Sequence, residues 1–312
     1  MPTSFGMTGW LRRRVNVIAG WYKTLHVRRV IFWQFAMILF RIRDLGPLNR
    51  RFAEELAAGC GDRFACVVDE RFGDVDTAPW PKVSLAVPAC EQIGLYCPDD
   101  VGWRCGDYGL YLARARFPDE PFFWIIEPDV RFGGAGSAAF FGMFRSDTSA
   151  DLLVADLRAA DRTYFWEFMV AERGLAVYRC IFPLVRVSAR AIDYLSAKRV
   201  LLSRNERRQR DWPNDESFVA TLLKNNPDMI CRDLNDFGST LYDADTLSFW
   251  KPLDGDNLHM RSDLVTIYHP VLFGADYRAK VERVEAPQPD RRLTRRIRRR
   301  LIREVNKRTR WQ

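Results

Sequence analysis

The stretch Phe122-Phe123-Trp124-Ile125-Ile126-Glu127-Pro128-Asp129-Val130-Arg131 decides how the rest of the chain is interpreted. Its unbroken apolar run, which leads into two carboxylates separated by a proline, is typical of a strand buried on both faces, as in a parallel sheet. Because Pro128 cannot donate a ladder hydrogen bond, Glu127 and Asp129 should lie at the carboxyl end of that strand. Open α/β sheets bind ligands at this edge, where two carboxylates can hold a hard divalent cation beside a phosphate. The alternative is an acidic strand end that only turns into solvent.

Length and composition favour a folded α/β protein with basic ends. The chain has 312 residues, of which 47% are hydrophobic and 13% aromatic, enough for one large domain or two small ones. Its seven cysteines are an odd number without a C-x-x-C pair, so we expect neither a zinc ribbon nor a disulfide framework, and a reducing cytoplasm. Residues 1–28 lack the features of a secretory signal, and the apolar run at 30–40 is too short to span a membrane.

The order of apolar runs and breakers predicts alternating strands and helices. Strand, helix and strand at 36–43, 48–58 and 64–68 form a βαβ unit, which requires a parallel sheet. We expect Gly59 to close that first helix and the glycine-rich segment 133–137 to be flexible. Further strands are expected at 83–87, 122–126, 151–155 and 180–187, and further helices at 107–116, 166–173, 189–202 and 215–223. The predicted fold is a single α/β domain over residues 35–275, with a mostly parallel central sheet flanked by helices.

The two ends of the chain differ from this domain in composition. Residues 1–34 form a basic, aromatic arm that is either an amphipathic surface helix or an ordinary packing helix. Residues 276–312 include an arginine-rich segment, 291–310, with apolar residues at helical spacing. That tail would lie on an anionic membrane surface, bind nucleic-acid phosphates without sequence preference, or stay solvated. We favour the membrane surface, so the protein is expected to be cytoplasmic and peripheral on the membrane, with no specific nucleic acid as partner.

Two more sites follow the carboxylates in the chain. Asp215 and Glu216 begin a helix after Trp212-Pro213-Asn214, and His269 precedes a proline at the end of the apolar stretch 264–268. Acidic residues in a first turn normally just complement the helix dipole, and a lone histidine is more often structural than a ligand. The order of the three sites carries more information than any one of them.

This order resembles that of the GT-A glycosyltransferases, and the segment from Pro213 to Leu222 is similar to a stretch of core-2/I-branching N-acetylglucosaminyltransferases. The resemblance implies a GT-A-like fold and transfer of a sugar from a nucleotide-sugar donor, UDP-linked, to a hydroxyl of a glycan or lipid-linked acceptor. It implies that Glu216, or its neighbour Asp215, is the catalytic base of an inverting reaction. Asp129 and His269 would then bind a divalent cation, Mn²⁺ or Mg²⁺.

The remaining donor-binding candidates come from the same resemblance. Asp69 matches the position that contacts the base or ribose, and Arg43 is a looser candidate for the same pocket. Glu127 and Asp129 would contact the diphosphate, with Asp129 the stronger ligand. The motif is Glu-Pro-Asp rather than Asp-x-Asp, and related enzymes that work without metal neutralise the diphosphate with basic side chains. Here those side chains would be Arg131, Arg186 or Lys251. Trp212 and Trp250 would stack on sugar rings or belong to the core.

The chemistry of such a transfer accounts for these residue types. The leaving diphosphate develops negative charge that a cation, arginine or lysine can stabilise, and the acceptor hydroxyl needs a carboxylate to take its proton. Two other classes remain open: a basic adaptor without enzymatic activity that binds membrane or nucleic acid, and a metal-dependent phosphoester hydrolase. A hydrolase would normally need more histidine and aspartate ligands than three scattered histidines supply.

Overall fold

The computed structural model describes residues 36–60, 63–161, 164, 175–205 and 212–286. The expected N-terminal arm, the helix at 166–173 and the tail helix at 291–310 lie outside these ranges. Among the described helices, none has both the length and the apolar character needed to cross a bilayer.

A seven-stranded sheet forms the centre of the molecule, with the strand order β3-β2-β1-β4-β7-β6-β8. Its strands are β1 (Met37–Ile42), β2 (Phe64–Val68), β3 (Lys82–Ser84), β4 (Phe122–Ile126), β6 (Leu152–Ala159), β7 (Tyr178–Ser188) and β8 (Cys231–Asp233). Neighbours are parallel except that β7 runs antiparallel to both β4 and β6. The predicted α/β class with a mostly parallel sheet is therefore confirmed.

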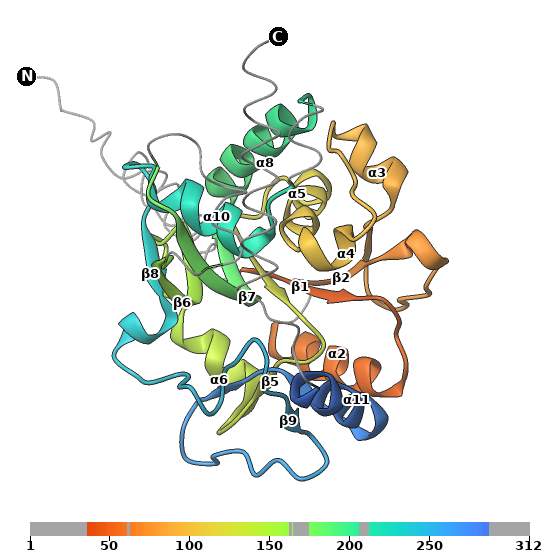
Figure 1. Cartoon of the computed structure of the whole chain (residues 1–312), viewed down its shortest axis with the longest axis vertical. Coiled ribbons are helices and arrows are strands. Elements are labelled where there is room, and N and C mark those ends of the chain that lie inside the picture. The colour runs from red at the N-terminus through yellow and green to blue at the C-terminus, as the bar shows by residue number, and fades with distance from the viewer. Residues whose placement is uncertain (1–35, 61–62, 162–163, 165–174, 206–211, 287–312) are drawn as a thin grey trace, which may run out of the picture.

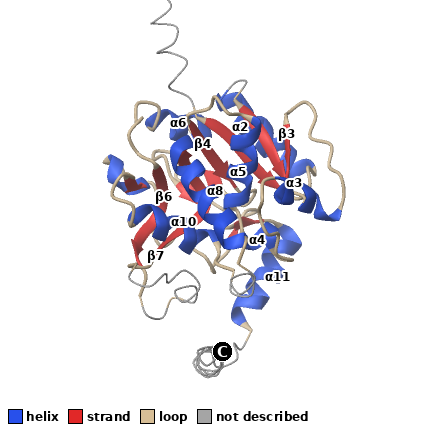
Figure 2. Ribbon diagram, turned by 90° about the horizontal axis from the view of Figure 1, so that it is seen from above, coloured by secondary structure: helices blue, strands red, loops and turns tan. Residues whose placement is uncertain are grey.

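Helices cover both faces of this sheet (Figure 1). One face carries α5 (Asp107–Arg116), α8 (Ala189–Ser203) and α10 (Asp215–Lys224), and the other carries α2 (Pro47–Cys60) and α6 (Gly136–Met143). Viewed from above, α5 and α8 lie across the strands (Figure 2). Alternation along β1 explains the two layers: Leu39 packs into the core beneath α5, and Phe40 packs into the core on the α2 side. The central strands are thus apolar on both faces, as the sequence predicted.

Four local predictions are corrected by the structure. Helix α2 continues through Gly59 to Cys60, so Gly59 does not end it. The glycine instead lies at the contact with α6, where an added Cβ would lie 3.4 Å from the Cα of Ala138. The strand expected at 83–87 is Lys82–Ser84, since Val87 begins helix α3 (Val87–Gln92) with a proline in its first turn. The segment 133–137 is not simply a flexible loop, because α6 begins at Gly136. In the apolar stretch 264–268, only β10 (Ile267–Tyr268) is a strand.

A small antiparallel ribbon returns the late part of the chain to the end of β4. In it β5 (Arg131–Phe132) pairs with β10, which places Tyr268 opposite Arg131. The N–H of Val271 then donates a 2.8 Å hydrogen bond to the carbonyl oxygen of Asp129. These contacts explain how His269, 140 residues after Asp129 in sequence, comes to lie beside it.

The other described elements surround this ribbon and the adjoining sheet edge. They are the short helices η1 (Glu70–Phe72), α4 (Val101–Arg104) and η2 (Leu234–Phe237), the strands β9 (Leu253–Asp254) and β11 (Val271–Leu272), and α11 (Gly274–Glu285). β11 pairs in parallel with β9. The expected domain boundary at residue 275 falls within α11.

Candidate functional site

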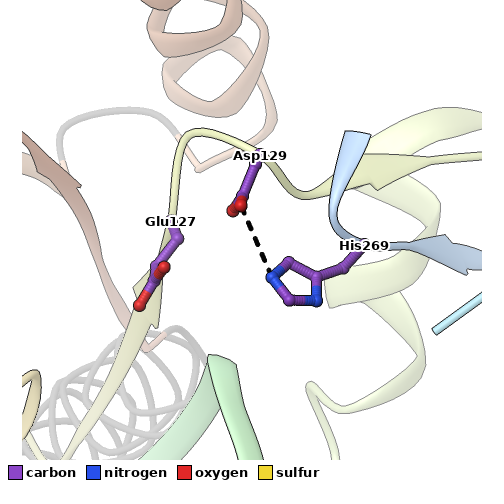
Figure 3. Close-up of side chains that lie close together, drawn as sticks. All are labelled: Glu127, Asp129 and His269. Atoms are coloured by element: carbon purple, nitrogen blue, oxygen red, sulfur yellow. Dashed lines mark ion pairs between the residues drawn. The ribbon is translucent and has the colours of Figure 1, made fainter. Parts of the chain in front are cut away.

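Glu127, Asp129 and His269 lie together at the carboxyl edge of the sheet. Each offers one ligand atom, and these atoms all lie within 4.8 Å of one another. The two carboxylates come from the bend after β4, and the imidazole reaches them from the opposite side, from the segment between β10 and β11 (Figure 3). The Nε2 atom of His269 is 3.5 Å from Oδ2 of Asp129. The two acidic side chains are half-buried, and His269 is buried.

The donor atoms of this cluster fit a divalent cation. Oδ1 of Asp129 is buried and has no hydrogen-bond partner within the described residues. Leaving such an oxygen unpaired costs about 1–3 kcal/mol, which a bound cation would offset. Burial alone would raise the pKa of Asp129, but His269 and then Arg41 outweigh it and hold that pKa below its usual value. Asp129 is therefore ionised at neutral pH, as a cation ligand must be.

Arg41, in β1, neutralises part of this acidic edge. Its guanidinium forms a close ion pair with Glu127 and donates a 2.8 Å hydrogen bond to the carbonyl oxygen of Gly102. The strand register explains the ion pair, because Phe40 pairs with Ile126 and so places Arg41 next to Glu127. Burial would lower the pKa of Arg41, but the carboxylates of Glu127, Asp215 and Asp129 raise it overall. Arg41 therefore remains a fixed positive charge among three carboxylates.

Asp215 fastens the start of α10 to the turn that precedes α5. One carboxylate oxygen accepts a 2.8 Å hydrogen bond from the N–H of Gly106, and the other accepts one of 2.8 Å from the N–H of Glu216. Burial, followed by the charge of Asp107, raises the pKa of Asp215 to about 7. Gly106 is required here because an added Cβ would lie 2.6 Å from the Asp215 carboxylate and 3.2 Å from the Arg41 guanidinium carbon.

Glu216 is the more accessible of the two acidic residues in this first turn. Asn214, the N-cap of α10, uses its side-chain oxygen to accept from the N–H of Ser217 and its amide to donate a 3.1 Å hydrogen bond to Glu216. The side chain of Glu216 is half-buried, whereas Asp215 is only 5% exposed. Burial and then the Asp215 carboxylate raise the pKa of Glu216 well above its usual value. A raised pKa makes this carboxylate a stronger base when it is ionised.

Asp69 lies at the end of β2, as expected, but it is already engaged. Its carboxylate accepts hydrogen bonds of 2.7 and 2.8 Å from Arg71. Burial would raise the pKa of Asp69, but Arg71 outweighs burial and lowers it overall. Arg43 is exposed, and its guanidinium lies 4.8 Å from the ring centroid of Phe72. The two residues predicted for a base or ribose pocket are thus on the same side of the sheet edge.

The three basic side chains proposed to neutralise a diphosphate are placed differently. Arg131 is sandwiched between the rings of Phe52 and Phe273, at 4.4 and 5.2 Å from their centroids. Arg186 pairs with Trp124 in the sheet register, away from the strand end, and forms a buried 2.8 Å ion pair with Asp147.

Lys251 is exposed. It lies in the loop between β9 and Ser248, whose N–H donates a hydrogen bond to the carbonyl oxygen of His269. Of the three basic residues, Arg186 does not lie beside the carboxylates of Glu127 and Asp129. The guanidinium that lies among Glu127, Asp129 and Asp215 is that of Arg41, which was not predicted from the sequence.

The two tryptophans proposed to stack on sugar rings differ in their exposure to solvent. Trp212 is fully buried and packs against Tyr96 and Arg199, at centroid distances of 5.2 and 5.4 Å, so it belongs to the core. Trp250 is 60% exposed, next to Lys251 in the loop after Ser248. Of the two, only Trp250 is accessible to a sugar ring.

The sequence carried a usable signal for one of the missed residues. Arg41 is a lone charge in an otherwise apolar strand, a pattern that indicates a paired or functional group. Its partner follows only from the register of β1 against β4. The role of Gly106 has no local signal, because it depends on how close a helix from another part of the chain approaches.

Comparisons with known proteins place few constraints on this chain. No protein-family model matches the sequence, and no curated protein matches it. The matching solved structures include that of mouse xyloside xylosyltransferase 1 in its apo form, with 12% identity, 75% of this chain and 97% of that chain covered, and a TM-score of 0.39. A similarity of this degree carries no functional information.

Proposed function

We propose that this chain is a glycosyltransferase that moves a sugar from a nucleotide-sugar donor, UDP-linked, to a hydroxyl of a glycan or lipid-linked acceptor. The observation that carries the proposal is the cluster of Glu127, Asp129 and His269 at the same sheet edge as the acidic start of α10. The cluster suits the binding of a charged diphosphate, and the acidic start of α10 suits the removal of a proton from a hydroxyl.

The donor side of the site consists of Arg41 and the three-residue cluster. Asp129 and His269, with Glu127, would hold a divalent cation, Mn²⁺ or Mg²⁺, and a cation bound there supplies charge stabilisation for the diphosphate leaving group. Arg41 keeps Glu127 in place and limits the net negative charge that the diphosphate meets. Asp69 and Arg43 remain the proposed contacts of the base or ribose, at the ends of β2 and β1.

The acceptor side of the site depends on Glu216. We assign the base to Glu216 rather than Asp215 because both Asp215 oxygens are occupied by backbone N–H donors. Among the described residues, the Asn214 amide is the one hydrogen-bond donor given to the Glu216 carboxylate, and Glu216 is partly exposed. A carboxylate that removes the acceptor proton during a direct displacement gives inversion at the sugar carbon, so the proposed reaction is inverting.

A thermal-shift panel tests the proposed function. The protein is melted with a set of sugar nucleotides and with UDP, each with Mn²⁺, with Mg²⁺ and with EDTA. We expect UDP and at least one UDP-sugar to raise the melting temperature, because a ligand that binds only the folded state stabilises it. No shift with any nucleotide diphosphate would contradict the proposal.

The base assignment needs a separate experiment. Glu216→Gln keeps the size of the side chain and its contact with Asn214 but cannot accept a proton. We expect donor binding to remain within about twofold while turnover falls by about 10²-fold or more, as for loss of a general base. Turnover equal to that of the unaltered protein would remove Glu216 from the mechanism.

Membrane association is a further part of the proposal and rests on the basic ends of the sequence. Those residues lie outside the described part of the chain. Sedimentation with vesicles of anionic and of neutral lipid, using the full chain and a chain ending at residue 286, tests it directly. We expect binding to anionic vesicles only, and loss of that binding when the basic tail is removed.

A further inference from the structure

Glu127 takes part in two sets of contacts at once. Its ligand atom lies within 4.8 Å of those of Asp129 and His269, which makes it part of the candidate cation site (Figure 3). Its Oε1 atom also forms a close ion pair with Nη2 of Arg41. The Glu127 side chain is 25% exposed and that of Arg41 is 11% exposed, so solvent screens this pair only in part. A cation at the cluster would therefore lie beside a carboxylate that already has a positive partner.

Arg41 is also held on the side away from Glu127. Its Nη1 atom donates a 2.8 Å hydrogen bond to the carbonyl oxygen of Gly102 in α4. That helix is attached to the turn before α10, because Arg104 donates a 3.1 Å hydrogen bond to the carbonyl oxygen of Trp212. The guanidinium also packs against the backbone of Gly106, where an added Cβ would lie 3.2 Å from both Cζ and Nη1 of Arg41. These contacts keep the positive charge of Arg41 at the sheet edge.

An arginine in this position weakens the cluster as a cation site. A guanidinium stays charged at any physiological pH, so deprotonation cannot release Glu127. A carboxylate with a guanidinium on one oxygen is a weaker ligand through the other, because the two positive charges share one negative charge and repel each other. In contrast, Oδ1 of Asp129 and Nδ1 of His269 are buried without a hydrogen-bond partner among the described residues. The cluster alone therefore offers a cation two available ligands rather than three.

A diphosphate changes this balance, because it is a second anion for the same guanidinium. Arginine has five N–H donors, and the contacts of Arg41 with Gly102 and Glu127 use one donor on each terminal nitrogen. Guanidinium groups bind phosphate oxygens strongly, often through two parallel hydrogen bonds. Mg²⁺ is commonly held by one or two carboxylates together with substrate phosphates. A diphosphate at this edge would thus supply ligands to the cation and a partner to Arg41 at the same time.

We propose that Arg41 makes cation binding conditional on the diphosphate. Without a nucleotide, Arg41 keeps Glu127 as its own partner, and a cation is bound weakly, by Asp129 and His269. With the diphosphate present, Arg41 pairs with its oxygens, and Glu127 becomes the third protein ligand. Arg41 is thus a positioning residue that acts on the cation through Glu127. The identity of the diphosphate rests on the proposed function, but the competition between Arg41 and the cation for Glu127 does not.

Mn²⁺ binding without a nucleotide tests this competition. Bound Mn²⁺ is measured from the loss of the electron paramagnetic resonance signal of the free ion. The proteins compared are the unaltered protein, Arg41→Met and the double variant Arg41→Met with Glu127→Gln. We expect Arg41→Met to bind Mn²⁺ at least about fivefold more tightly, because Glu127 is then available, and the double variant to return to within about twofold of the unaltered protein. A merely structural role of Arg41 would instead weaken Mn²⁺ binding.

The same titrations with saturating UDP test the conditional step. The Mn²⁺ held by UDP alone is subtracted with a titration that contains no protein. In the unaltered protein UDP should raise the affinity for Mn²⁺ at least about tenfold, and Mn²⁺ should raise the affinity for UDP by the same factor. This factor should fall at least about fivefold in Arg41→Met and in the double variant, because neither can transfer Glu127 from an arginine to the cation.

A control variant removes an arginine from the other end of α5. Arg114 forms its ion pair with Asp193, whose carboxylate is 56% exposed, and neither residue belongs to the candidate site. Arg114→Met lowers the net charge of the protein by the same amount as Arg41→Met. It should bind Mn²⁺ as the unaltered protein does, with UDP and without it. This comparison separates the position of Arg41 from a general effect of net charge.

The outcomes separate this proposal from the proposed function. Unchanged or weaker Mn²⁺ binding in Arg41→Met, or a gain that the double variant keeps, would overturn the competition. If the double variant lost Mn²⁺ affinity without UDP as strongly as with it, Glu127 would be an unconditional ligand and the proposal would be wrong. If UDP did not bind the unaltered protein while Mn²⁺ behaved as expected, the proposed function would fail and the competition would stand. If Arg41→Met does not fold, the double variant, which leaves neither member of the pair charged, provides the test by itself.

Discussion

The fully buried ion pair between Arg199 and Asp107 gives the sharpest stability prediction. Both side chains have no exposed surface. Arg199 donates hydrogen bonds of 2.8 and 3.2 Å to the Asp107 carboxylate and one of 3.0 Å to the carbonyl oxygen of Pro213, and its guanidinium carbon lies 3.8 Å from the ring centroid of Phe218. The pair therefore connects α5 and α8 to the turn that leads into Asp215 and Glu216.

Arg199→Met removes the cation and leaves the Asp107 carboxylate buried, with the Tyr111 hydroxyl, at 2.7 Å, as its remaining side-chain partner among the described residues. Breaking a buried pair by removing one partner costs about 3–5 kcal/mol, so we expect a loss of about 4 kcal/mol in the free energy of unfolding. With an m value of about 3 kcal/mol per M of urea, the unfolding midpoint should fall by more than about 1 M.

A control pair lies between the same two helices. Arg114 in α5 and Asp193 in α8 form a 3.0 Å ion pair whose carboxylate is 56% exposed. Arg114→Met should cost at most about 1 kcal/mol, because an exposed pair is weak. The double variant Arg199→Met with Asp107→Asn should lose less than the sum of its single variants, because it leaves no buried charge. If Arg199→Met cost no more than Arg114→Met, the assignment of this pair as the connection beneath the site would be wrong.

Three further predictions concern the site and its supports. Gly106→Ala should lower the melting temperature and weaken UDP binding, because the added Cβ would lie 2.6 Å from the Asp215 carboxylate. Gly142→Ala should be neutral or stabilising, because no described residue lies within 4 Å of its added Cβ. Because burial raises the pKa of Asp215 from 3.8 to about 7, the protonated carboxyl favours the folded state most strongly below pH 4, and this contribution is lost as the pH rises through about 7. Between pH 4 and pH 8, the free energy of unfolding of the unaltered protein should therefore fall relative to that of Asp215→Asn by at most about 4 kcal/mol, at 1.36 kcal/mol for each pKa unit. Unfolding experiments on both proteins at the two pH values measure this difference. Ser188→Ala should cost about 1 kcal/mol in urea unfolding, because the Ser188 hydroxyl caps α8.

The fold could be predicted from the sequence wherever the local pattern of apolar and polar residues matched the burial of the element. Five apolar residues before Glu127 predicted a strand buried on both faces, and β4 is such a strand. The acidic turn after Asn214 predicted the start of α10 correctly. Predictions were wrong where a residue is needed for a contact with a distant part of the chain. Gly59 was predicted to end a helix, but it lies within α2 where that helix contacts α6.

The site was predicted less completely because its geometry depends on register and on strand direction. Arg43 was selected at the end of β1, but pairing with β4 places Arg41 against Glu127. Arg186 was proposed for the diphosphate, but β7 runs antiparallel to β4, which carries Arg186 back into the sheet, to Asp147. Neither fact can be obtained from residue spacing alone, because both depend on which strands become neighbours.

The most direct test of the central claim is a calorimetric titration of UDP, with Mn²⁺ and with EDTA, into the unaltered protein and into Asp129→Asn. If Glu127, Asp129 and His269 hold the cation beside the diphosphate, UDP should bind tightly with Mn²⁺, and either EDTA or Asp129→Asn should weaken it at least tenfold, which corresponds to 1.4 kcal/mol. Binding of UDP with the same Kd in all four combinations would contradict the claim.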